Sequence, residues 1–363
     1  MAHALRLAAR GAYTTKPNPM VGCVLAHGER VVGSGFHARA GQPHAEPLAL
    51  AQAGDAARGA TAYVTLEPCA HTGRTGPCVD ALIGAGVARV VAAMRDPFRH
   101  VDGAGFERLR AAGIEVAVGL MEAQARALNR GFLSRIERGR PFVTVKLATS
   151  LDGRSAMASG DSKWISGEQS RHDVHRLRAR SGAIVTGAGT VLADDPQLSA
   201  RLPADVEVVQ PLRVVLDPGL ATVARGRVRE GEAPTLYIHA PNTKVPRGLK
   251  AELAHAPVRA GMVDLHAVLQ LLAAREVNDV LVETGATLAG AFMAEHLVDE
   301  LVLYVAPVLL GAQARPLFGG LHIEAMAERY ELELVDTRSV GDDLRLTLLP
   351  RGVPTPAPAP ADS

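Results

Sequence analysis

Three short stretches bring one histidine and two cysteines to places where strands end or helices begin, and this pattern constrains the fold more than any other. His44-Ala45-Glu46 opens a predicted helix, Glu67-Pro68-Cys69 ends a predicted strand, and Pro77-Cys78 precedes a second predicted helix. One imidazole and two thiolates can hold Zn²⁺ and leave its fourth position open. The dipole at a helix start also favours a thiolate. The chain is therefore expected to fold so that these stretches meet around one metal ion.

Glu46 adds an acid–base group to this pattern. It follows His44 by two residues, so its carboxylate can reach a water on the metal without binding the metal. A carboxylate in that place can take the proton of the water and pass it to a departing amine. His-x-Glu followed later by Pro-Cys is the signature of zinc deaminases. Eight residues separate Cys69 from Cys78, however, where the commonest form of the signature has two.

Other interpretations of these residues are open at this point. The histidine and the two cysteines could be unrelated, with His44 exposed and the cysteines buried. A purely structural zinc site would usually have a fourth protein ligand, which His71 could supply; contact with substrate is the other interpretation of His71. Cys23 has no such context and is predicted to be a buried strand residue.

Strand-like and helix-like segments alternate along the chain, which predicts an α/β fold with three layers in the first half. The strands expected there are residues 21–26, 31–35, 61–66, 89–93 and 114–118, and the helices are 45–53, 79–85, 105–112 and 122–133. A charged segment broken by Gly and Pro, residues 136–141, predicts a domain boundary. The strands expected beyond it are 142–148, 183–186, 212–216, 235–239, 279–283, 301–305, 331–335 and 344–349, with helices at 168–180, 265–274 and 288–296.

Charge and composition exclude several classes of function. The chain of 363 residues has 39 Lys and Arg against 38 Asp and Glu, and aromatic residues make up 4%. Nucleic-acid binding is therefore not expected, because it needs a basic excess and stacking surfaces. The first ten residues lack the apolar core of a signal peptide, and the longest apolar run is too short to span a membrane, so a cytoplasmic protein is expected. Three cysteines also argue against a disulfide framework.

The second half has two glycine-bearing turns that follow apolar strands. Gly187-Ala188-Gly189-Thr190-Val191-Leu192 begins like a dinucleotide fingerprint but lacks its third glycine. Gly285-Ala286-Thr287-Leu288-Ala289-Gly290 opens a predicted helix without the Lys-Ser/Thr pair of a P-loop. Such a turn still presents free backbone N–H groups to a phosphate. A plain structural turn is the alternative.

Taken together, these motifs resemble the bifunctional deaminase–reductases of riboflavin biosynthesis. The resemblance rests on Thr15-Lys16-Pro17-Asn18-Pro19-Met20-Val21-Gly22, on Gly41-Gln42-Pro43-His44-Ala45-Glu46 and on the run from Glu67 to Cys78. It continues through Val145-Lys146-Leu147-Ala148-Thr149-Ser150-Leu151-Asp152-Gly153-Arg154 and Thr190-Val191-Leu192-Ala193-Asp194-Asp195-Pro196. The long loop between the cysteines is the rule in that family. Three residues depart from its pattern: Gly76 and Pro218, where Pro and Ser are usual, and Phe98, where many members have Asn.

The resemblance implies the fold and the deaminase site. A cytidine-deaminase-like α/β/α domain would cover residues 1–138, a dihydrofolate-reductase-like α/β domain residues 139–350, and a disordered Pro/Ala tail residues 351–363. His44, Cys69 and Cys78 would hold one Zn²⁺ per chain, with Glu46 as the proton shuttle. The contacts expected for a pyrimidine nucleotide with a 5′-phosphate are Asn18, His37, His71, Arg74 and Asp96.

For the second domain the resemblance implies NADPH as cofactor. The matching cofactor positions are Ala148, Trp164, Thr190, Asp194, Gly285, Ala286, Thr287, Leu288, Ala289, Gly290 and Ala291. The matching substrate positions are Ser162, Arg178, Leu198, Arg201 and Glu283. Lys146 is a candidate for contacting the sugar or the cofactor, without an assigned proton-transfer role.

The implied activity has two steps. Zinc-dependent deamination of 2,5-diamino-6-(5-phosphoribosylamino)pyrimidin-4(3H)-one would be followed by NADPH-dependent reduction to 5-amino-6-(5-phosphoribitylamino)uracil. The alternatives are a monofunctional deaminase with a degenerate reductase domain and a zinc-stabilised nucleotide-binding module, the latter disfavoured by Glu46. The expected partners are the small-molecule substrate and a second copy of the chain, paired through the reductase domain.

Overall fold

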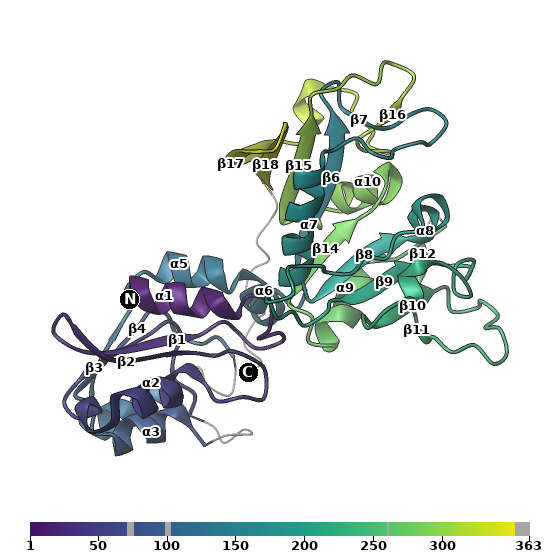
Figure 1. Ribbon diagram of the computed structural model, residues 1–363. Helices are drawn as coiled ribbons and strands as arrows, with labels where there is room; N and C mark the ends of the chain where they lie inside the picture. The colour runs from purple at the N-terminus through teal and green to yellow at the C-terminus, as the bar shows by residue number, and fades with distance from the viewer. Residues whose placement is uncertain (71–75, 99–102, 260, 353–363) are drawn as a thin grey trace. The chain divides into compact units, whose positions relative to one another are not determined.

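The computed structural model describes residues 1–70, 76–98, 103–259 and 261–352, and it divides the chain into two compact units, Met1–Gly139 and Arg140–Ser363 (Figure 1). The division falls where helix α6 (Arg130–Arg138) ends at Gly139, whose φ of 69° is the left-handed conformation that glycine adopts without strain. The residues predicted as a Pro/Ala tail lie outside the described residues from 353 onward. Each unit has its own sheet and its own apolar core.

The first unit is built on a five-stranded sheet with the order β2-β1-β3-β4-β5. Its strands are β1 (Gly22–His27), β2 (Arg30–Phe36), β3 (Thr61–Val64), β4 (Arg89–Ala92) and β5 (Glu115–Val118). Strand β1 pairs antiparallel with β2 and β3, and β3, β4 and β5 run parallel. The parallel strands bring their carboxyl ends to one edge of the sheet, which is where ligand sites of α/β proteins form.

Helices cover both faces of this sheet and give the predicted three layers. The helices before α6 are α1 (Ala2–Ala8), α2 (Ala45–Ala53), α3 (Cys78–Gly84), α4 (Ala104–Ala111) and α5 (Glu122–Leu128). Figure 1 shows α1 and α5 on one face and α2 and α3 on the other. The core between sheet and helices is aliphatic and includes Leu25, Val64, Leu82 and Val90.

Two features of the first unit differ from the sequence prediction. Helix α1 was not expected, and the single helix predicted over residues 122–133 is the two helices α5 and α6. The break lies at Asn129, where φ is −105°. The Asn129 carboxamide accepts from Met20 N at 2.8 Å and donates to Met20 O at 2.9 Å, so it holds a distant backbone segment instead of continuing the helix.

The second unit is built on a nine-stranded sheet with the order β11-β10-β9-β8-β14-β6-β15-β18-β17. Its strands are β6 (Phe142–Ser150), β8 (Ala183–Gly187), β9 (Leu212–Leu216), β10 (Thr235–His239), β11 (Glu252–His255), β14 (Asp279–Glu283), β15 (Glu300–Ala306), β17 (Leu332–Val340) and β18 (Asp343–Pro350). Two short ribbons pair β7 (Arg154–Ala156) with β16 (Arg315–Pro316) and β12 (Val258–Arg259) with β13 (Met262–Val263). The sheet is parallel except at β18 and β17.

The helices of the second unit are α7 (Glu168–Arg180), α8 (Ala188–Asp194), α9 (Leu265–Ala274) and α10 (Ala286–Ala294). Alternate strand residues pack on opposite faces, since Val185 belongs to the core under α9 and α10, whereas Ile184 packs with Val191 of α8. The observed bounds of α7, α9, β9, β10 and β14 are those predicted from the sequence. Helix α8 and the short strands β7, β11, β12, β13 and β16 were not predicted. Among the helices of the described residues, none combines the length and the apolar character needed to cross a membrane.

Candidate active sites

The predicted metal ligands meet at the carboxyl edge of the first sheet. His44 directly precedes α2, Cys78 is the first residue of α3, and Cys69 follows the end of β3. His44 Nδ1 lies 3.3 Å from Cys78 Sγ and 3.6 Å from Cys69 Sγ, and all three ligand atoms lie within 4.8 Å of one another. Nitrogen and sulfur atoms at these separations suit one tetrahedral Zn²⁺ with an open fourth position.

The electrostatics of the two cysteines also fit a cation. The Cys78 backbone N–H donates to Cys69 Sγ at 3.4 Å. Hydrogen bonds from Cys78 lower the pKa of Cys69 to about 4, whereas its thiolate neighbour and burial raise the pKa of Cys78. Without a metal the pair therefore keeps one proton between the two sulfurs. A divalent cation between them stabilises both thiolates and releases that proton.

Glu46 is buried in the first turn of α2, with 3% of its surface exposed. Its Oε2 atom has no hydrogen-bond partner among the residues that the structure describes. Burial raises the pKa of Glu46, and the nearby Cys69 sulfur raises it further. A buried carboxyl group with one unpartnered oxygen is costly by itself. It is explained by a ligand between it and the three metal-binding side chains, such as a metal-bound water.

His37 and Asn18 form a hydrogen-bonded chain beside the metal site. The His37 and His44 rings pack edge to face with centroids 5.2 Å apart. His37 Nδ1 lies 3.2 Å from Pro43 O, and its Nε2 lies 3.0 Å from Asn18 Nδ2. Burial lowers the pKa of His37, so the ring is neutral, donating to Pro43 O and accepting from the Asn18 amide. This chain fixes which end of the Asn18 carboxamide faces His37.

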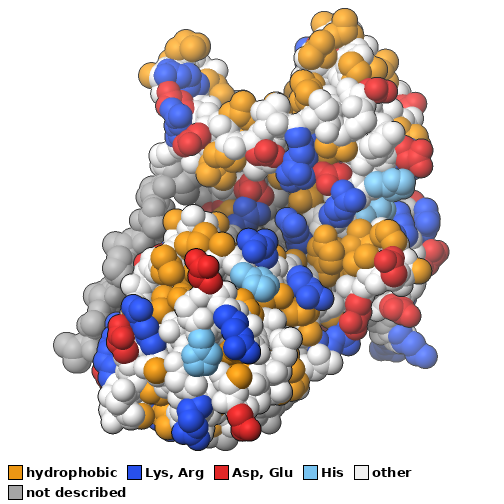
Figure 2. Space-filling view, turned by 60° about the vertical axis from the view of Figure 1, so that its left-hand side comes forward, with side chains coloured by type: hydrophobic (Ala, Val, Ile, Leu, Met, Phe, Trp, Pro, Cys, Tyr) orange, Lys and Arg blue, Asp and Glu red, His pale blue; other side chains and the backbone are white. Residues whose placement is uncertain are grey.

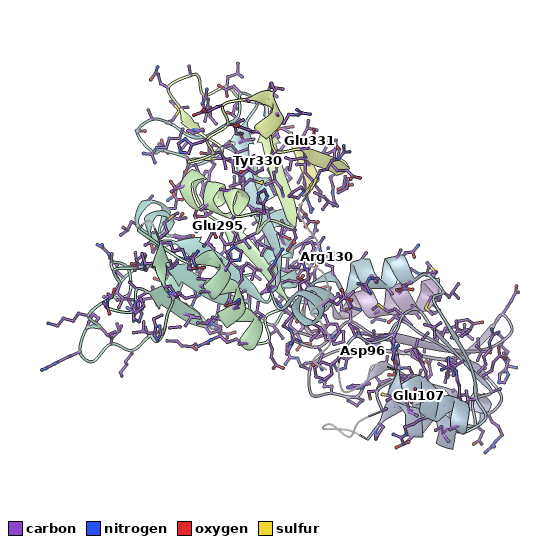
Figure 3. All side chains as sticks on the ribbon, turned by 180° about the vertical axis from the view of Figure 1, so that it is seen from behind. Asp96, Glu107, Arg130, Glu295, Tyr330 and Glu331 are labelled. Atoms are coloured by element: carbon purple, nitrogen blue, oxygen red, sulfur yellow. The ribbon has the colours of Figure 1, made fainter. Side chains whose placement is uncertain are left out.

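Glu67 is a site residue that the sequence analysis did not single out. Its carboxylate is buried directly before Pro68 and Cys69 and accepts four backbone N–H groups. The donors are Asp96 N at 3.3 Å, Gly103 N at 3.1 Å, Gly105 N at 3.0 Å and Phe106 N at 3.4 Å. Glu67 thereby joins the strand end that carries a metal ligand to the segment of Asp96 and the start of α4, where Asp96 and Glu107 are labelled in Figure 3.

The remaining predicted contacts of the first site are only partly described. Asp96 is buried, and its Oδ1 accepts the Phe98 N–H at 2.9 Å, a backbone contact that does not depend on the side chain at position 98. His71 and Arg74 lie outside the described residues. A Cβ atom at Gly76 would meet no other atom within 4 Å, so this departure from the family pattern relieves no crowding.

A cavity of about 920 Å³ in the second unit opens at the carboxyl ends of β6, β8, β9 and β14. Its lining residues come from many stretches of sequence between Lys146 and Arg315. The predicted substrate and cofactor residues on its wall are Ala148, Ser162, Trp164, Arg178, Thr190, Asp194, Leu198, Arg201, Glu283, Gly285, Ala286, Thr287 and Leu288. Pro218 also lies on the wall, without the hydroxyl that the family usually has there.

The floor of this cavity has one tightly paired set of charges. Arg178 and Glu283 form a two-pronged ion pair, with Nε–Oε1 at 2.6 Å and Nη2–Oε2 at 2.8 Å. Lys146 on β6 stands beside Glu283 on β14, and its Nζ lies 5.6 Å from the centre of the Tyr304 ring. Loss of hydration lowers the pKa of Lys146, which Glu283 partly offsets. The cavity therefore contains an ammonium group that gives up its proton more readily than a surface lysine.

The turn before α10 has the properties of a phosphate-binding turn. Gly285 precedes the helix without a side-chain cap, its N–H donates to Thr190 Oγ1 at 3.3 Å, and a Cβ there would meet nothing within 4 Å. The first N–H groups of α10 therefore face an open part of the cavity wall. Ala289, Gly290 and Ala291 do not line the cavity. A Cβ at Gly290 would lie 1.8 Å from Gly319 O, so this glycine allows a close backbone approach.

Trp164 stands at the cavity wall with 70% of its surface exposed. The Arg171 guanidinium lies 4.8 Å from the centre of its ring and donates to Ser166 O at 2.8 Å. An exposed indole held by a cation is a stacking surface for a flat ligand ring. The sequence analysis did not single out Arg171, because its position after Trp164 gives no signal of this contact.

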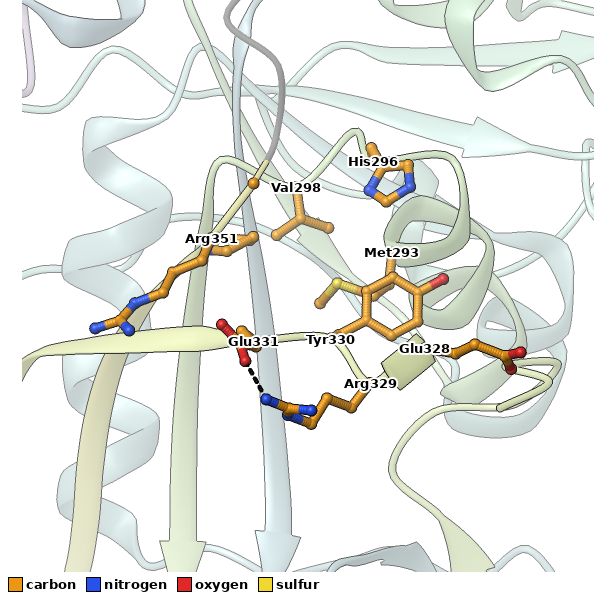
Figure 4. A pocket seen from close by; sticks show the side chains of 10 residues that line it. Met293, His296, Val298, Glu328, Arg329, Tyr330, Glu331 and Arg351 are labelled. Carbon is orange, nitrogen blue, oxygen red and sulfur yellow. Dashed lines mark hydrogen bonds and ion pairs between the residues drawn. The ribbon is translucent and has the colours of Figure 1, made fainter. Parts of the chain in front are cut away.

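A second cavity of about 320 Å³ lies at the other end of the unit, between α10 and the start of β17 (Figure 4). Its wall includes Met293, His296 and Tyr330, and Arg329 pairs with Glu331 across its edge. None of the predicted site residues lies there. Most of the predicted reductase residues line the larger cavity instead.

Two protein families match the two halves of the chain. Residues 1–94 match the family described as cytidine and deoxycytidylate deaminase zinc-binding region, and residues 141–346 match the RibD C-terminal domain. The chain is 46% identical over 361 residues to riboflavin biosynthesis protein RibD of Escherichia coli strain K12, covering 96% of this chain and 98% of the relative. The corresponding protein of Haemophilus influenzae is 45% identical over 365 residues, covering 97% of each.

Solved structures agree with these matches. The fold is similar to that of Acinetobacter baumannii RibD, with a TM-score of 0.90, 45% identity and coverage of 96% of this chain and 97% of the other. A Thermotoga maritima diaminohydroxyphosphoribosylaminopyrimidine deaminase/5-amino-6-(5-phosphoribosylamino)uracil reductase has a TM-score of 0.85 at 34% identity, covering 96% and 97%. The predicted fold class, a cytidine-deaminase-like unit followed by a reductase unit, is confirmed.

Proposed function

This chain belongs to the RibD family of riboflavin-biosynthesis proteins, and we propose from that premise which residues perform each of its two reactions. The protein is a bifunctional enzyme that uses Zn²⁺ and NADPH, a hydrolase in its first unit and an oxidoreductase in its second. The observation that carries the assignment of the deaminase site is the buried Glu46 carboxyl beside His44, Cys69 and Cys78.

In the deaminase site, His44, Cys69 and Cys78 would hold Zn²⁺. The bound ion would supply Lewis-acid activation of a water molecule. Glu46 takes a proton from that water and delivers it to the amino group that leaves as ammonia. Asn18, oriented by the neutral His37, contacts the polar edge of the pyrimidine ring. Asp96, whose backbone N–H donates to Glu67, is a further substrate contact.

In the reductase site, the turn from Gly285 to Leu288, together with Ala148, Trp164, Thr190 and Asp194, would bind NADPH. The cofactor would supply the hydride that reduces C1′ of the ring-opened ribosylamine, which reacts as an imine. Lys146 donates the proton that the attached nitrogen gains, because its lowered pKa and its place on the cavity floor suit that transfer. The ion pair between Arg178 and Glu283 fixes the positions of these two charged side chains beside Lys146.

The proposed substrate of the first site is a diaminopyrimidinone that carries a phosphoribosylamino group, and its deaminated product is the proposed substrate of the second site. One coupled assay tests the assignment: the diamino substrate is mixed with enzyme and NADPH, and ammonia release and NADPH absorbance are followed together. Both signals are expected, with NADPH consumed only after ammonia appears. Ammonia without NADPH oxidation would favour the monofunctional deaminase with a degenerate reductase unit.

NADPH is expected to be preferred over NADH in that assay. The glycine turns lack the acidic residue that a Rossmann site places on the ribose 2′-hydroxyl, so no such carboxylate opposes a 2′-phosphate. Equal turnover with NADH would contradict this part of the proposal. We propose the cytoplasm as the compartment of both reactions, because the free cysteines Cys69 and Cys78 would bind zinc as thiolates and a reducing compartment preserves thiols.

We also propose that two copies of the chain form a homodimer through their reductase units. Strand β17 is the edge of the nine-stranded sheet, and its Leu334 and Val335 are 56% and 46% exposed. Hydrophobic side chains reach the surface among charged ones in Figure 2. A long edge strand with exposed apolar residues is usually covered. Sedimentation analysis should give a dimer, and Leu334→Lys should shift it toward monomer; a parent protein that is monomeric at all concentrations would contradict this.

A further inference from the structure

A buried tyrosine lies directly behind the floor of the reductase cavity. Tyr304 of β15 has none of its surface exposed, and it does not line the cavity. Strand pairing sets Tyr304 beside Ala148, and it sets Val302, two residues earlier in β15, beside Lys146. Residues two apart in a strand point to the same face of a sheet. Tyr304 and Lys146 therefore lie on one side of the sheet, the side that packs against helix α7.

The aromatic face of Tyr304 is in contact with the Lys146 ammonium. Lys146 Nζ lies 5.6 Å from the ring centre, which is within the range of a cation–π interaction. Glu283 stands beside Lys146 on β14, but both of its carboxylate oxygens accept from Arg178 of α7. Burial lowers the pKa of Lys146, the charge of Glu283 raises it, and the charge of Arg178 lowers it. An ammonium group that has lost hydration gains more from an aromatic face than one in bulk water does.

A buried ion pair anchors the hydroxyl of Tyr304. The hydroxyl donates to Asp173 Oδ2 at 2.7 Å, and Arg345 Nη1 of β18 donates to the same oxygen at 2.8 Å. Arg176 of α7 lies 3.8 Å from the other oxygen of Asp173, whereas Asp173 and Arg345 are both buried. Burial raises the pKa of Tyr304, and the bond to Asp173 raises it further, so the phenol stays neutral and donates. The ring is therefore fixed by its hydroxyl before any ligand arrives.

We propose that Tyr304 is a positioning residue of the reductase, whose ring holds the Lys146 ammonium at the floor of the cavity. The inference rests on the proposed function, in which Lys146 donates a proton to the nitrogen attached to C1′. A lysine side chain is long and flexible, and in an open cavity it would spread over several rotamers. The fixed ring selects the positions in which the ammonium lies over its face, and it favours the protonated form that the reaction needs. Asp173 and Arg345 contribute through Tyr304, because they hold its hydroxyl.

Tyr304→Leu tests the ring, with the kcat of the reductase measured against pH on deaminated substrate. Without the aromatic face the ammonium is less stable, so Lys146 should lose its proton at a lower pH. The alkaline limb of the kcat profile should therefore move down by about one pH unit. Tyr304→Phe keeps the ring and should leave the limb close to that of the parent. Equal shifts in the two variants would assign the effect to the hydroxyl instead of the ring and would overturn the proposal.

A second series at position 304 keeps the shape of the buried side chain, so it does not depend on the folding of Tyr304→Leu. Phenylalanines that carry successively more ring fluorines, incorporated at this position, weaken the negative face of the ring with little change in volume. The alkaline limb should move to lower pH with each added fluorine. A limb that stays in place throughout the series would contradict the contact between the ring and the ammonium.

Tyr237→Leu is the matched control, because Tyr237 of β10 is equally buried in the same sheet but packs in a different part of the core. It should lower stability without moving the limb. Acetic anhydride labelling of Lys146 at several pH values, measured by mass spectrometry against the exposed Lys244, gives the midpoint of deprotonation without any reaction. If the parent fails to reduce the substrate, the proposed function is wrong, but a lower midpoint in Tyr304→Leu still supports the hold of Tyr304 on Lys146. Unchanged midpoints in the Tyr304 variants, or the same shift in Tyr237→Leu, would overturn the proposal.

Discussion

The deaminase centre and the reductase cavity are built in different ways. The deaminase centre places three ligand atoms within 4.8 Å of one another, and its ligands and Glu46 come from three short stretches of sequence. The reductase cavity is about 920 Å³, and its wall is drawn from strand ends and loops spread over most of the second unit. A compact metal site depends on a few side chains, whereas a wide cavity depends on the arrangement of a whole sheet. Single substitutions should therefore act very differently on the two.

The largest effect is expected at the metal ligands. Cys69→Ser or Cys78→Ser leaves two ligands, so each variant should lose its zinc and release no measurable ammonia. Metal analysis of the purified proteins and an ammonia assay check this. Cys23→Ser is the matched control, because Cys23 is buried in β1 outside the ligand cluster and should keep about one zinc per chain. Full zinc in both ligand variants would disprove the assignment.

Glu46→Gln should separate chemistry from metal binding. Gln cannot accept a proton, and loss of general acid–base catalysis typically costs ~10²–10⁴-fold in rate. Ammonia release should fall by that factor while the zinc content stays that of the parent. Reduction of already deaminated substrate should proceed at close to the parental rate, because the second unit has its own sheet and core.

Asp194→Ala is the converse variant, at a residue that lines the cavity and that we propose to bind NADPH. It should release ammonia normally and oxidise NADPH slowly. If either Glu46→Gln or Asp194→Ala disabled both steps in a folded, metal-loaded protein, the contrast between two independent sites would be lost. One shared site, or tight coupling between the units, would then replace it.

A smaller effect is expected at Glu67, where the deaminase centre does depend on a wider frame. In Glu67→Gln the side-chain NH₂ group would face backbone N–H groups that donate to the carboxylate in the parent protein. Because two donors then oppose each other, the free energy of unfolding should fall by about 1–3 kcal/mol. We expect a raised KM for the diamino substrate with less change in kcat, because the segment of Asp96 shifts. Chemical denaturation and steady-state kinetics measure both. Glu107→Gln, on the exposed side of α4, should change neither; an equal effect there would mean that lost charge, and not lost hydrogen bonding, is responsible.

The smallest effect concerns pH and the reductase cavity. Burial, together with the charges of Arg178 and Arg201, lowers the pKa of His175 to about 4 from the ordinary value of 6.5. As the pH falls, His175 is therefore protonated at a higher pH in the unfolded chain than in the folded protein. The stability contributed by neutral His175 is present above pH 6.5 and is lost as the pH falls toward 4. Denaturation of parent and His175→Gln proteins at several pH values should show a shallower decline for the variant. Parallel declines would contradict this.

The sequence predicted most where the determining interactions are local. Helix α2 was predicted with its observed bounds, because Gly54 directly follows it. His44, Cys69 and Cys78, which the structure brings together, were singled out because their chemistry is unusual at that spacing. Helix α8 was missed because its seven residues directly follow Gly187 in a stretch that also fits a glycine turn. The pattern could not show the split at Asn129 either, since its cause is a bond to Met20, 109 residues away.

Residues whose partners are backbone groups from distant segments were not predictable. Glu67 looked like part of a motif, but its four N–H donors become neighbours only when α4 packs against the strand end. Arg213 occupies an otherwise apolar strand, and its acceptors at Gln197 and Glu230 come from loops without regular structure. Lys146 was noted as a candidate, yet its lowered pKa is caused by burial in the folded unit, and the strand pairing places Glu283, which partly offsets that shift, beside it.

The close approach of Gly290 to Gly319 has a consequence for engineering the turn that we propose to bind NADPH. A library that varies residues 285–291 to change cofactor choice would include one position that no side chain can occupy, since even a methyl group at Gly290 meets a carbonyl oxygen at 1.8 Å. Variants there would be lost through misfolding and would be mistaken for evidence of cofactor contact. Gly285, whose Cβ direction is open, is the position at which diversity can be selected. Within this turn, position 285 therefore tolerates a side chain, whereas position 290 does not.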